Sequence, residues 1–132
     1  MPEQHLFEYA VIRVVPQVER EEFLNAGVVL YCAAQKFLQV KFQLDEERLK
    51  LFSDRLDIEE IKEYLCAFER ICAGKPDGGP IAKLSMPERF RWLTATRSTI
   101  VQTSKVHPGF CTDAADMLAK LFRQMVLPPV TP

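Results

Sequence analysis

The segment Phe7–Val15 constrains the fold most, because it is a β-prone run whose two faces are both largely apolar. β-Branched and aromatic residues dominate the segment, and Pro16 ends it. A strand of this kind is typical of the interior of a sheet. Arg13 interrupts the apolar pattern, and a buried guanidinium needs a partner because an unpaired charge in a core is costly.

Two more strands follow and predict a hairpin. An apolar run predicts a strand over Gly27–Cys32. Alternation of apolar and polar residues predicts another strand over Phe37–Gln43, with one face exposed to solvent. Their short connection makes the pair antiparallel. The segment Gln17–Ala26 is too long for a tight turn, so we expect a short helical turn there, followed by Gly27 as a position of backbone freedom.

The remainder of the chain is predominantly helical. Apolar residues at three- and four-residue steps, polar caps and the stop at Gly74 predict helices over Asp45–Phe52, Asp57–Ala73, Met86–Leu93 and a last segment capped by Thr112 or Asp113. Weak alternation predicts a fourth strand over Arg97–Ser104, at a sheet edge, and Val106–Gly109 is expected to be a turn.

This order of elements favours an α+β fold. We expect a sheet of about four strands, mainly antiparallel, with helices packed on one face. The length of 132 residues fits a single domain over residues 1–132, with an ordered core over about 6–127 and a frayed, proline-rich C-terminal tail.

Composition excludes several classes of protein. With 48% apolar residues and a net charge of −1, the chain does not resemble a disordered protein. Its longest apolar run, Ala26–Ala34, is shorter than the roughly 20 residues that span a bilayer. Met1–His5 is polar and acidic, unlike a secretory leader, so we expect a cytoplasmic protein with reduced cysteines and no membrane partner.

The charges are distributed unevenly along the chain. Residues 1–73 carry a balance of −5, and residues 74–132 carry +4, with the excess in Lys83, Arg89, Arg91, Arg97 and Lys105. These arginines either pair with the acidic helices of the first half, with Trp92 as a core anchor, or form a site for a small anion together with nearby hydroxyls. Five cations over this length are too few to favour a long nucleic acid.

Few residues point to catalysis. His107 and Cys111 are four residues apart, so a thiolate–imidazole pair is one interpretation. The alternative is a histidine bonded to backbone and a cysteine that packs the helix start. No metal-ligand spacing and no phosphate-loop motif occurs, so no metal and no cofactor is expected. For Arg13, Glu22 or Glu8 would be a partner in a salt bridge that fixes the following loop.

Several stretches together resemble a known family: Phe7–Pro16, Val18–Cys32, Gly79–Ile81, Glu88–Thr99 and Val106–His107. They are similar to the uncharacterised bacterial family catalogued as domain of unknown function 3037. The resemblance implies no chemistry, but it implies a partner, because members neighbour a gene for a HipA-like kinase. It places eight polar residues inside family motifs and assigns no role to them: Arg13, Glu22, Asn25, Arg89, Arg91, Arg97, Ser98 and His107.

Two functions therefore compete. The first is a non-enzymatic protein-interaction or regulatory module, with a kinase-like neighbour as its partner. The second is an anion-, phosphate- or nucleic-acid-binding protein or enzyme with an Arg-rich site around residues 89–107, which requires that those side chains converge on one concave surface. An exposed edge at Arg97–Ser104 would also be compatible with a dimer.

Overall fold

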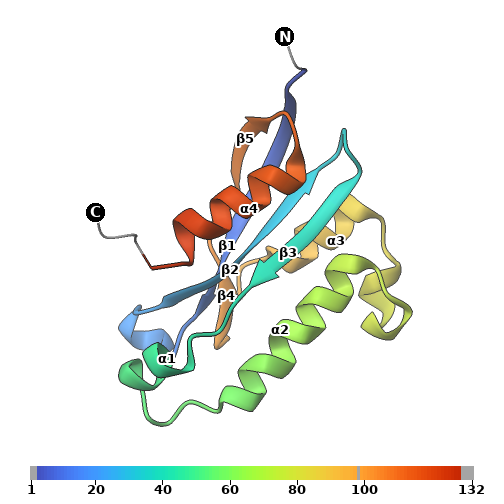
Figure 1. Ribbon diagram of the computed structural model, residues 1–132. Helices are drawn as coiled ribbons and strands as arrows, with labels where there is room; N and C mark the ends of the chain where they lie inside the picture. The colour runs from blue at the N-terminus through green and yellow to red at the C-terminus, as the bar shows by residue number, and fades with distance from the viewer. Residues whose placement is uncertain (1–2, 98, 129–132) are drawn as a thin grey trace.

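The computed structural model describes residues 3–97 and 99–128. An antiparallel sheet of long and short strands lies at its centre (Figure 1). The sheet order is β3–β2–β1, and β4 and β5 both pair with the far side of β1. The strands are β1 (His5–Val14), β2 (Leu24–Cys32), β3 (Phe37–Phe42), β4 (Val101–Thr103) and β5 (His107–Cys111). The predicted interior position of the first strand, the hairpin and the α+β class are confirmed.

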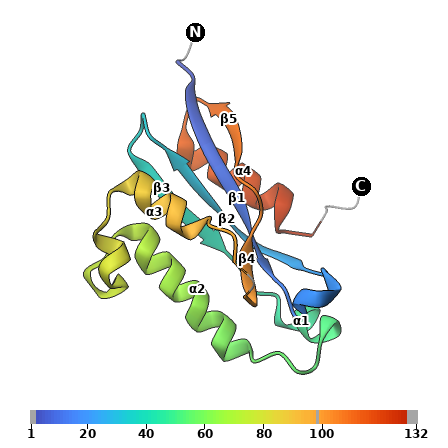
Figure 2. The same ribbon diagram turned by 180° about the vertical axis from the view of Figure 1, so that it is seen from behind.

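The two short strands form one interrupted edge along β1. β4 pairs with Ile12–Val14 and β5 with His5–Tyr9, both antiparallel, so they lie end to end (Figure 2). Ser104 closes the gap between them. Its N–H donates to Val11 O at 2.8 Å, and its buried Oγ accepts from the N–H of Val11, also at 2.8 Å. The predicted edge strand is thus correct in place but shorter than Arg97–Ser104, and the expected turn at Val106–Gly109 is wrong because His107 begins β5.

Four helices follow the predicted segments closely. Each begins after a side chain that accepts a hydrogen bond from the first turn, which is the arrangement that stabilises a helix start. The helices and their capping residues are α1 (Glu46–Phe52, Asp45), α2 (Ile58–Ala73, Asp57), α3 (Met86–Leu93, Ser85) and α4 (Ala114–Met125, Asp113). Gly74 ends α2 in a left-handed conformation, with φ of 68°.

The described residues also contain three short 3-10 turns. One of them, Val18–Arg20, is the helical turn predicted between the first two strands. The other two, Pro76–Gly78 and Pro80–Lys83, lie in the segment between α2 and α3. The predicted frayed tail after Pro128 lies outside the described residues.

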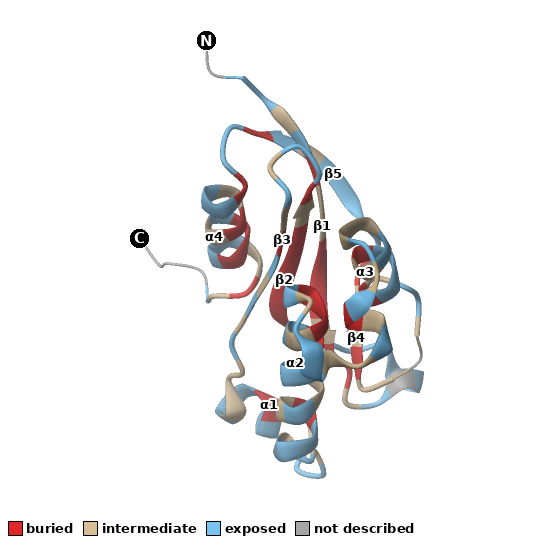
Figure 3. Cartoon of the chain, turned by 90° about the vertical axis from the view of Figure 1, so that its right-hand side faces the viewer, coloured by how far each residue is buried: buried red, intermediate tan, exposed pale blue. Residues whose placement is uncertain are grey.

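The helices cover both faces of the sheet, which corrects the expectation of one covered face. One core packs α1, α2 and α3 against Ala10, Ile12 and Val14 of β1; we call this side the α2 face. The other core packs α4 against Phe7 of β1 and Leu30 of β2; we call this side the α4 face. Figure 3 shows α4 on one side of the strands and α3 on the other.

A β-bulge in β2 explains why both faces are apolar. The register with β1 skips Ala26, since Ile12 lies opposite Gly27 and Arg13 opposite Asn25. Ala26 therefore points into the α2 face and Val28 into the α4 face, although strict alternation would place them together. Gly27 is required by space and not by a positive φ: a Cβ there would lie 2.7 Å from the carbonyl oxygen of Lys41.

Candidate functional site

The arginines and the histidine of residues 89–107 do not converge on one concave surface. Arg89 and Arg97 line two different hollows of the molecule. Arg91 is exposed on α3, and His107 is exposed on β5, with its ring centroid 5.4 Å from that of Tyr9. Ser98 lies outside the described residues. The converged anion site that the sequence suggested is thus divided, and each cation has to be considered separately.

Arg89 connects α3 to the end of α2. Its Nη1 donates to Leu84 O at 2.8 Å, and its guanidinium lies over Gly74, where an added Cβ would be 3.2 Å from Cζ. The Nε of Arg89 is buried, with no hydrogen-bond partner among the described residues. None of the three ion pairs among those residues involves Arg89 or Arg91, so the two halves of the chain are not joined through them by ion pairs.

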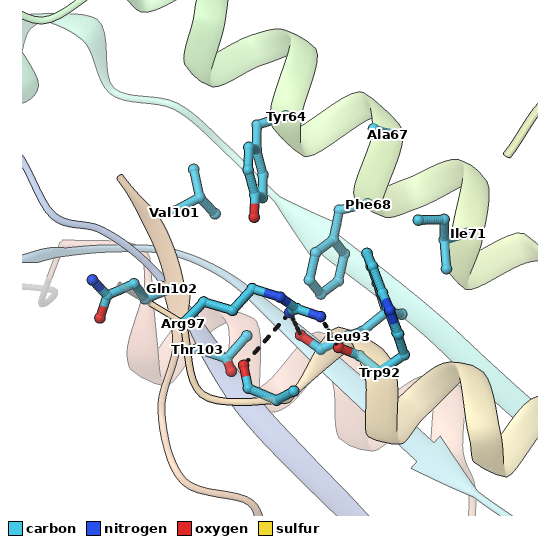
Figure 4. Close-up of a pocket in the computed structure, with 11 residues that line it drawn as sticks. Tyr64, Ala67, Phe68, Ile71, Trp92, Leu93, Arg97, Val101, Gln102 and Thr103 are labelled. Carbon is cyan, nitrogen blue, oxygen red and sulfur yellow. Dashed lines mark hydrogen bonds between the residues drawn. The ribbon is translucent and has the colours of Figure 1, made fainter. Parts of the chain in front are cut away.

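A mainly apolar hollow lies where α2, the end of α3 and β4 meet, and we call it the α2–α3–β4 pocket (Figure 4). Its volume is about 210 Å³. Phe68 and Ile71 line it from α2, Trp92 from α3 and Val101 from β4. These elements are distant in sequence, and they meet because β4 pairs with β1 under the helix layer.

Arg97 supplies the charge of this pocket. Its Cζ lies 4.2 Å from the centroid of the Trp92 ring, in a cation–π arrangement. Its Nη1 and Nη2 donate to backbone carbonyls at the end of α3, those of Leu93 and Trp92, and also to Ala95 O. Among the described residues no ion pair neutralises Arg97, so its positive charge faces only carbonyl dipoles and an aromatic ring.

Two hydroxyl-bearing side chains complete the lining. Thr103 belongs to β4, and its Oγ1 is buried without a hydrogen-bond partner in the described part of the chain. Tyr64 belongs to α2, and its phenol oxygen points into the pocket in Figure 4. Buried hydroxyls are normally hydrogen-bonded, so the Thr103 hydroxyl is available to a ligand or to a bound water.

Arg13 and Asn25 lie side by side on the α4 face, as register partners on β1 and β2. The Arg13 guanidinium lies 4.0 Å from the centroid of the Phe23 ring, and Asn25 Nδ2 donates to Met125 O at 2.9 Å. The predicted salt bridge from Arg13 to Glu22 is wrong, since Glu22 pairs with Arg20. Glu8 takes part in none of the described ion pairs either. The guanidinium is stabilised by the aromatic ring instead.

The thiol hypothesis for Cys111 does not fit the geometry. Cys111 is buried in the α4-face core, and burial is the main cause that raises the pKa of its thiol, which disfavours a thiolate. His107 lies at the other end of the same strand, exposed to solvent. Burial likewise raises the pKa of Cys72 to about 12. All four cysteines are free thiols, and three of them are buried.

The described residues contain no group of three side chains arranged to hold a metal ion. Within the same ranges, none of the helices has the length and apolar character needed to cross a membrane.

The outer end of the sheet presents uncovered apolar side chains. Leu6 of β1 and Phe110 of β5 are register partners on the α2 face, and they are 53% and 64% exposed. None of the helices that the structure describes covers them, and β5 is coloured as exposed in Figure 3. We call Leu6 and Phe110 the edge pair. Adjacent exposed apolar side chains at an open sheet edge are typical of an interaction surface.

Sequence reasoning missed two features of these surfaces. The edge pair was hidden because Pro108-Gly109 suggested a turn, although Gly109 lies in a strand with the Phe7 ring packed over it. Tyr64 carried no signal, because its place beside Trp92 and Arg97 follows from tertiary packing alone.

Comparisons with known proteins agree with the family suggested by the sequence. No curated protein and no solved structure matches the chain. One family model, described as "Protein of unknown function (DUF3037)", matches residues 9–126. This range includes β1 from Tyr9 onward, the strands β2 to β5 and the helices α1 to α4. The chain therefore belongs to the DUF3037 family.

Proposed function

We propose that this protein is a non-enzymatic protein-interaction module that binds an extended segment of a partner along β5. The edge pair carries the proposal, because it combines exposed apolar area with a strand edge that pairs with no other described strand. Strand addition of this kind takes affinity from main-chain hydrogen bonds and specificity from alternate side chains.

The backbone of β5 supports this mode of binding. Val11 and Val15 direct their backbone groups toward Ser104 and Ile100, so alternation directs those of Phe7 and Tyr9 toward β5. Their register partners Gly109 and His107 are thus bonded to β1, and Pro108 and Phe110 face outward. Of these two outward-facing residues, Pro108 has no backbone N–H. The Phe110 N–H is therefore the one donor that they offer to a partner strand.

A second copy of the chain is a poorer occupant than a different segment. Antiparallel pairing of two β5 strands centred on Gly109 would set Phe110 opposite Pro108 of the other copy, where proline lacks the reciprocal N–H. A partner segment without proline supplies both donor and acceptor at each outward position. A large apolar side chain opposite Phe110 would cover the edge pair on the α2 face.

The test combines a screen for a binding partner with a measurement of hydrogen exchange at a single backbone amide. We would screen a phage-displayed library of short linear peptides and, because the family resemblance implies such a partner, a purified HipA-like kinase from the same source. Binding is expected to slow exchange of the Phe110 amide and to be lost in Phe110→Lys. Leu51→Lys is the matched control, because Leu51 is 88% exposed on α1, away from β5.

Each result decides the proposal. Binding that survives Phe110→Lys, or that leaves exchange at Phe110 unchanged, would overturn it. A library without enriched peptides together with a kinase that does not bind would also overturn it. Self-association is measured by size-exclusion chromatography with light scattering. If the protein self-associates and Phe110→Lys abolishes this, the occupant of the β5 edge is a second copy of the chain and not a partner segment.

We also place this function in the cytoplasm. Four free thiols, three of them buried, support a reducing compartment. Fractionation of cells that express the tagged full chain tests the location, and recovery outside the soluble cytoplasmic fraction would contradict it.

A further inference from the structure

We propose that the α2–α3–β4 pocket binds a small monocarboxylate with an apolar body, whose carboxylate meets Arg97. The site is separate from the edge pair, so this inference stands independently of the interaction proposed above. Three observations carry it: the shape and lining of the pocket, the unneutralised charge of Arg97 and the unpartnered hydroxyl of Thr103.

The lining selects an apolar body of limited size. Side chains that face the pocket from α2 and from the end of α3 are mainly aromatic or branched, namely Phe68, Ile71 and Trp92. The volume of about 210 Å³ has room for several water molecules. A single ring or a short branched chain with one headgroup fits such a space.

The charge selects an anionic headgroup. No described ion pair involves Arg97, and the three carbonyls that it contacts carry no net charge. Those contacts engage Nη1 and one side of Nη2. Among the described residues nothing accepts from Nε–H, so this donor is available to a carboxylate oxygen.

The number of charges favours a carboxylate over a phosphate. Arg97 is the only charged residue that lines the pocket in the described part of the chain. One guanidinium balances a single negative charge, whereas a phosphate monoester carries between one and two near neutral pH and is usually met by several cations. The Thr103 hydroxyl and the Tyr64 phenol are then available as donors to the same headgroup or to a bound water.

Trp92 makes the site directly observable. It is the only tryptophan in the chain, and it lies in the pocket wall under the Arg97 guanidinium. Its fluorescence therefore reports on this site alone. A ligand that displaces water from the ring should shift the emission to shorter wavelength, in a saturable manner.

The experiment titrates the full chain with four probes: phenylacetate, its neutral isostere phenylacetamide, phenyl phosphate and acetate. We expect phenylacetate to bind at least tenfold more tightly than phenylacetamide, because a charge-assisted hydrogen bond is lost in the amide. Acetate, which lacks the apolar body, should bind more weakly than phenylacetate by a similar factor.

Variants assign the effect to the residues named. Arg97→Gln should weaken phenylacetate binding at least tenfold and leave phenylacetamide binding within about twofold. Arg91→Gln removes the same charge from α3 at an exposed position outside the pocket, so it should leave both affinities unchanged. Ala67→Phe adds a ring at the pocket's rim and should abolish binding of every probe without disturbing the core.

Arg97 also contacts the carbonyls at the end of α3, so each variant is first checked by circular dichroism and thermal melting. If Arg97→Gln is unfolded, Ala67→Phe and the phenylacetamide comparison still decide the result. Equal affinities for phenylacetate and phenylacetamide, tighter binding of phenyl phosphate, or equal losses in Arg97→Gln and Arg91→Gln would each overturn the assignment. So would the absence of any saturable change in Trp92 emission.

Discussion

On the α4 face, one helix lies across the sheet and its apolar side chains pack directly onto β1 and β2 around Phe7, Leu30 and Leu118. On the α2 face, the covering layer is assembled from three helices, and an open pocket remains where α2, α3 and β4 meet. A single helix closes its core along its own length, whereas separate elements leave space at their junction. The α2 face is thus suited to bind a ligand and the α4 face to stabilise the fold.

The largest expected effect separates the two faces by truncating one core residue on each. Leu118→Ala should lower the free energy of unfolding by about 3–4 kcal/mol, because it leaves a closed cavity in the α4-face core. Ile71→Ala, beside the pocket, should cost nearer 2 kcal/mol, since its side chain already borders open space. Urea denaturation of both variants measures the difference, and the reverse order would contradict the comparison.

The second prediction concerns the bulge in β2, which directs Ala26 and Val28 to opposite faces of the sheet. In Gly27→Ala the new Cβ would lie 2.7 Å from Lys41 O and 2.8 Å from Phe42 Cβ, so β3 has to move. We expect a loss of about 3 kcal/mol in the free energy of unfolding, at the upper end for steric overpacking. Ala34→Ser is the control, since it also enlarges a small side chain of the β2–β3 hairpin, but at an exposed turn position. An equal loss in both would refute a steric role for Gly27.

The third prediction compares two adjacent hydroxyls on the interrupted edge, those of Ser104 and Thr103. Ser104→Ala leaves the buried N–H of Val11 without its acceptor and should cost about 1–2 kcal/mol. Thr103→Val removes a buried hydroxyl that has no partner among the described residues, so stability should be unchanged or slightly higher. Thermal melts at one protein concentration distinguish them. A loss in Thr103→Val equal to that in Ser104→Ala would show that Thr103 is already satisfied.

The smallest effect concerns the surface of the α2 face, where Lys62 of α2 lies 2.8 Å from Glu46 of α1. The hydrogen bond from Lys62, followed by its charge, lowers the pKa of Glu46 from its ordinary 4.5. The stabilisation is therefore present above pH 4.5 and is lost as the pH falls through the folded-state pKa. In Lys62→Met, an NMR titration should show the Glu46 pKa restored toward its ordinary value. Overall stability should barely change, because the pair is exposed.

Much of the fold follows from local pattern, and the tertiary placement does not. Capping residues such as Asp57 and Ser85, and the stop at Gly74, act within one turn of chain, so helix bounds were predictable. The second covered face was not, because the bulge at Ala26 places Ala26 and Val28 on opposite sides against simple alternation. Register shifts of this kind depend on the partner strand and leave no periodicity in one sequence.

The candidate site was predictable only in its parts. Arg97, Trp92 and the hydroxyls of the basic segment were recognisable as polar and aromatic groups close in sequence. Their separation from Arg89 depends on the path of the chain after α3, where Arg97 folds back over the carbonyls at the end of that preceding helix. Which of several neighbouring cations faces a pocket is decided by that packing, and composition carries no information about it.

The pairing of β1 with the edge strands also has a consequence for how the chain is made. Val11 and Ser104 are bonded to each other across 93 residues of sequence. At a synthesis rate of about 5–20 residues per second, the outer side of β1 waits roughly 5–20 s for its partner to leave the ribosome. During that interval the nascent chain exposes an apolar strand edge, the feature that most readily recruits other unfolded chains. The last third of the chain therefore protects the first third from aggregation.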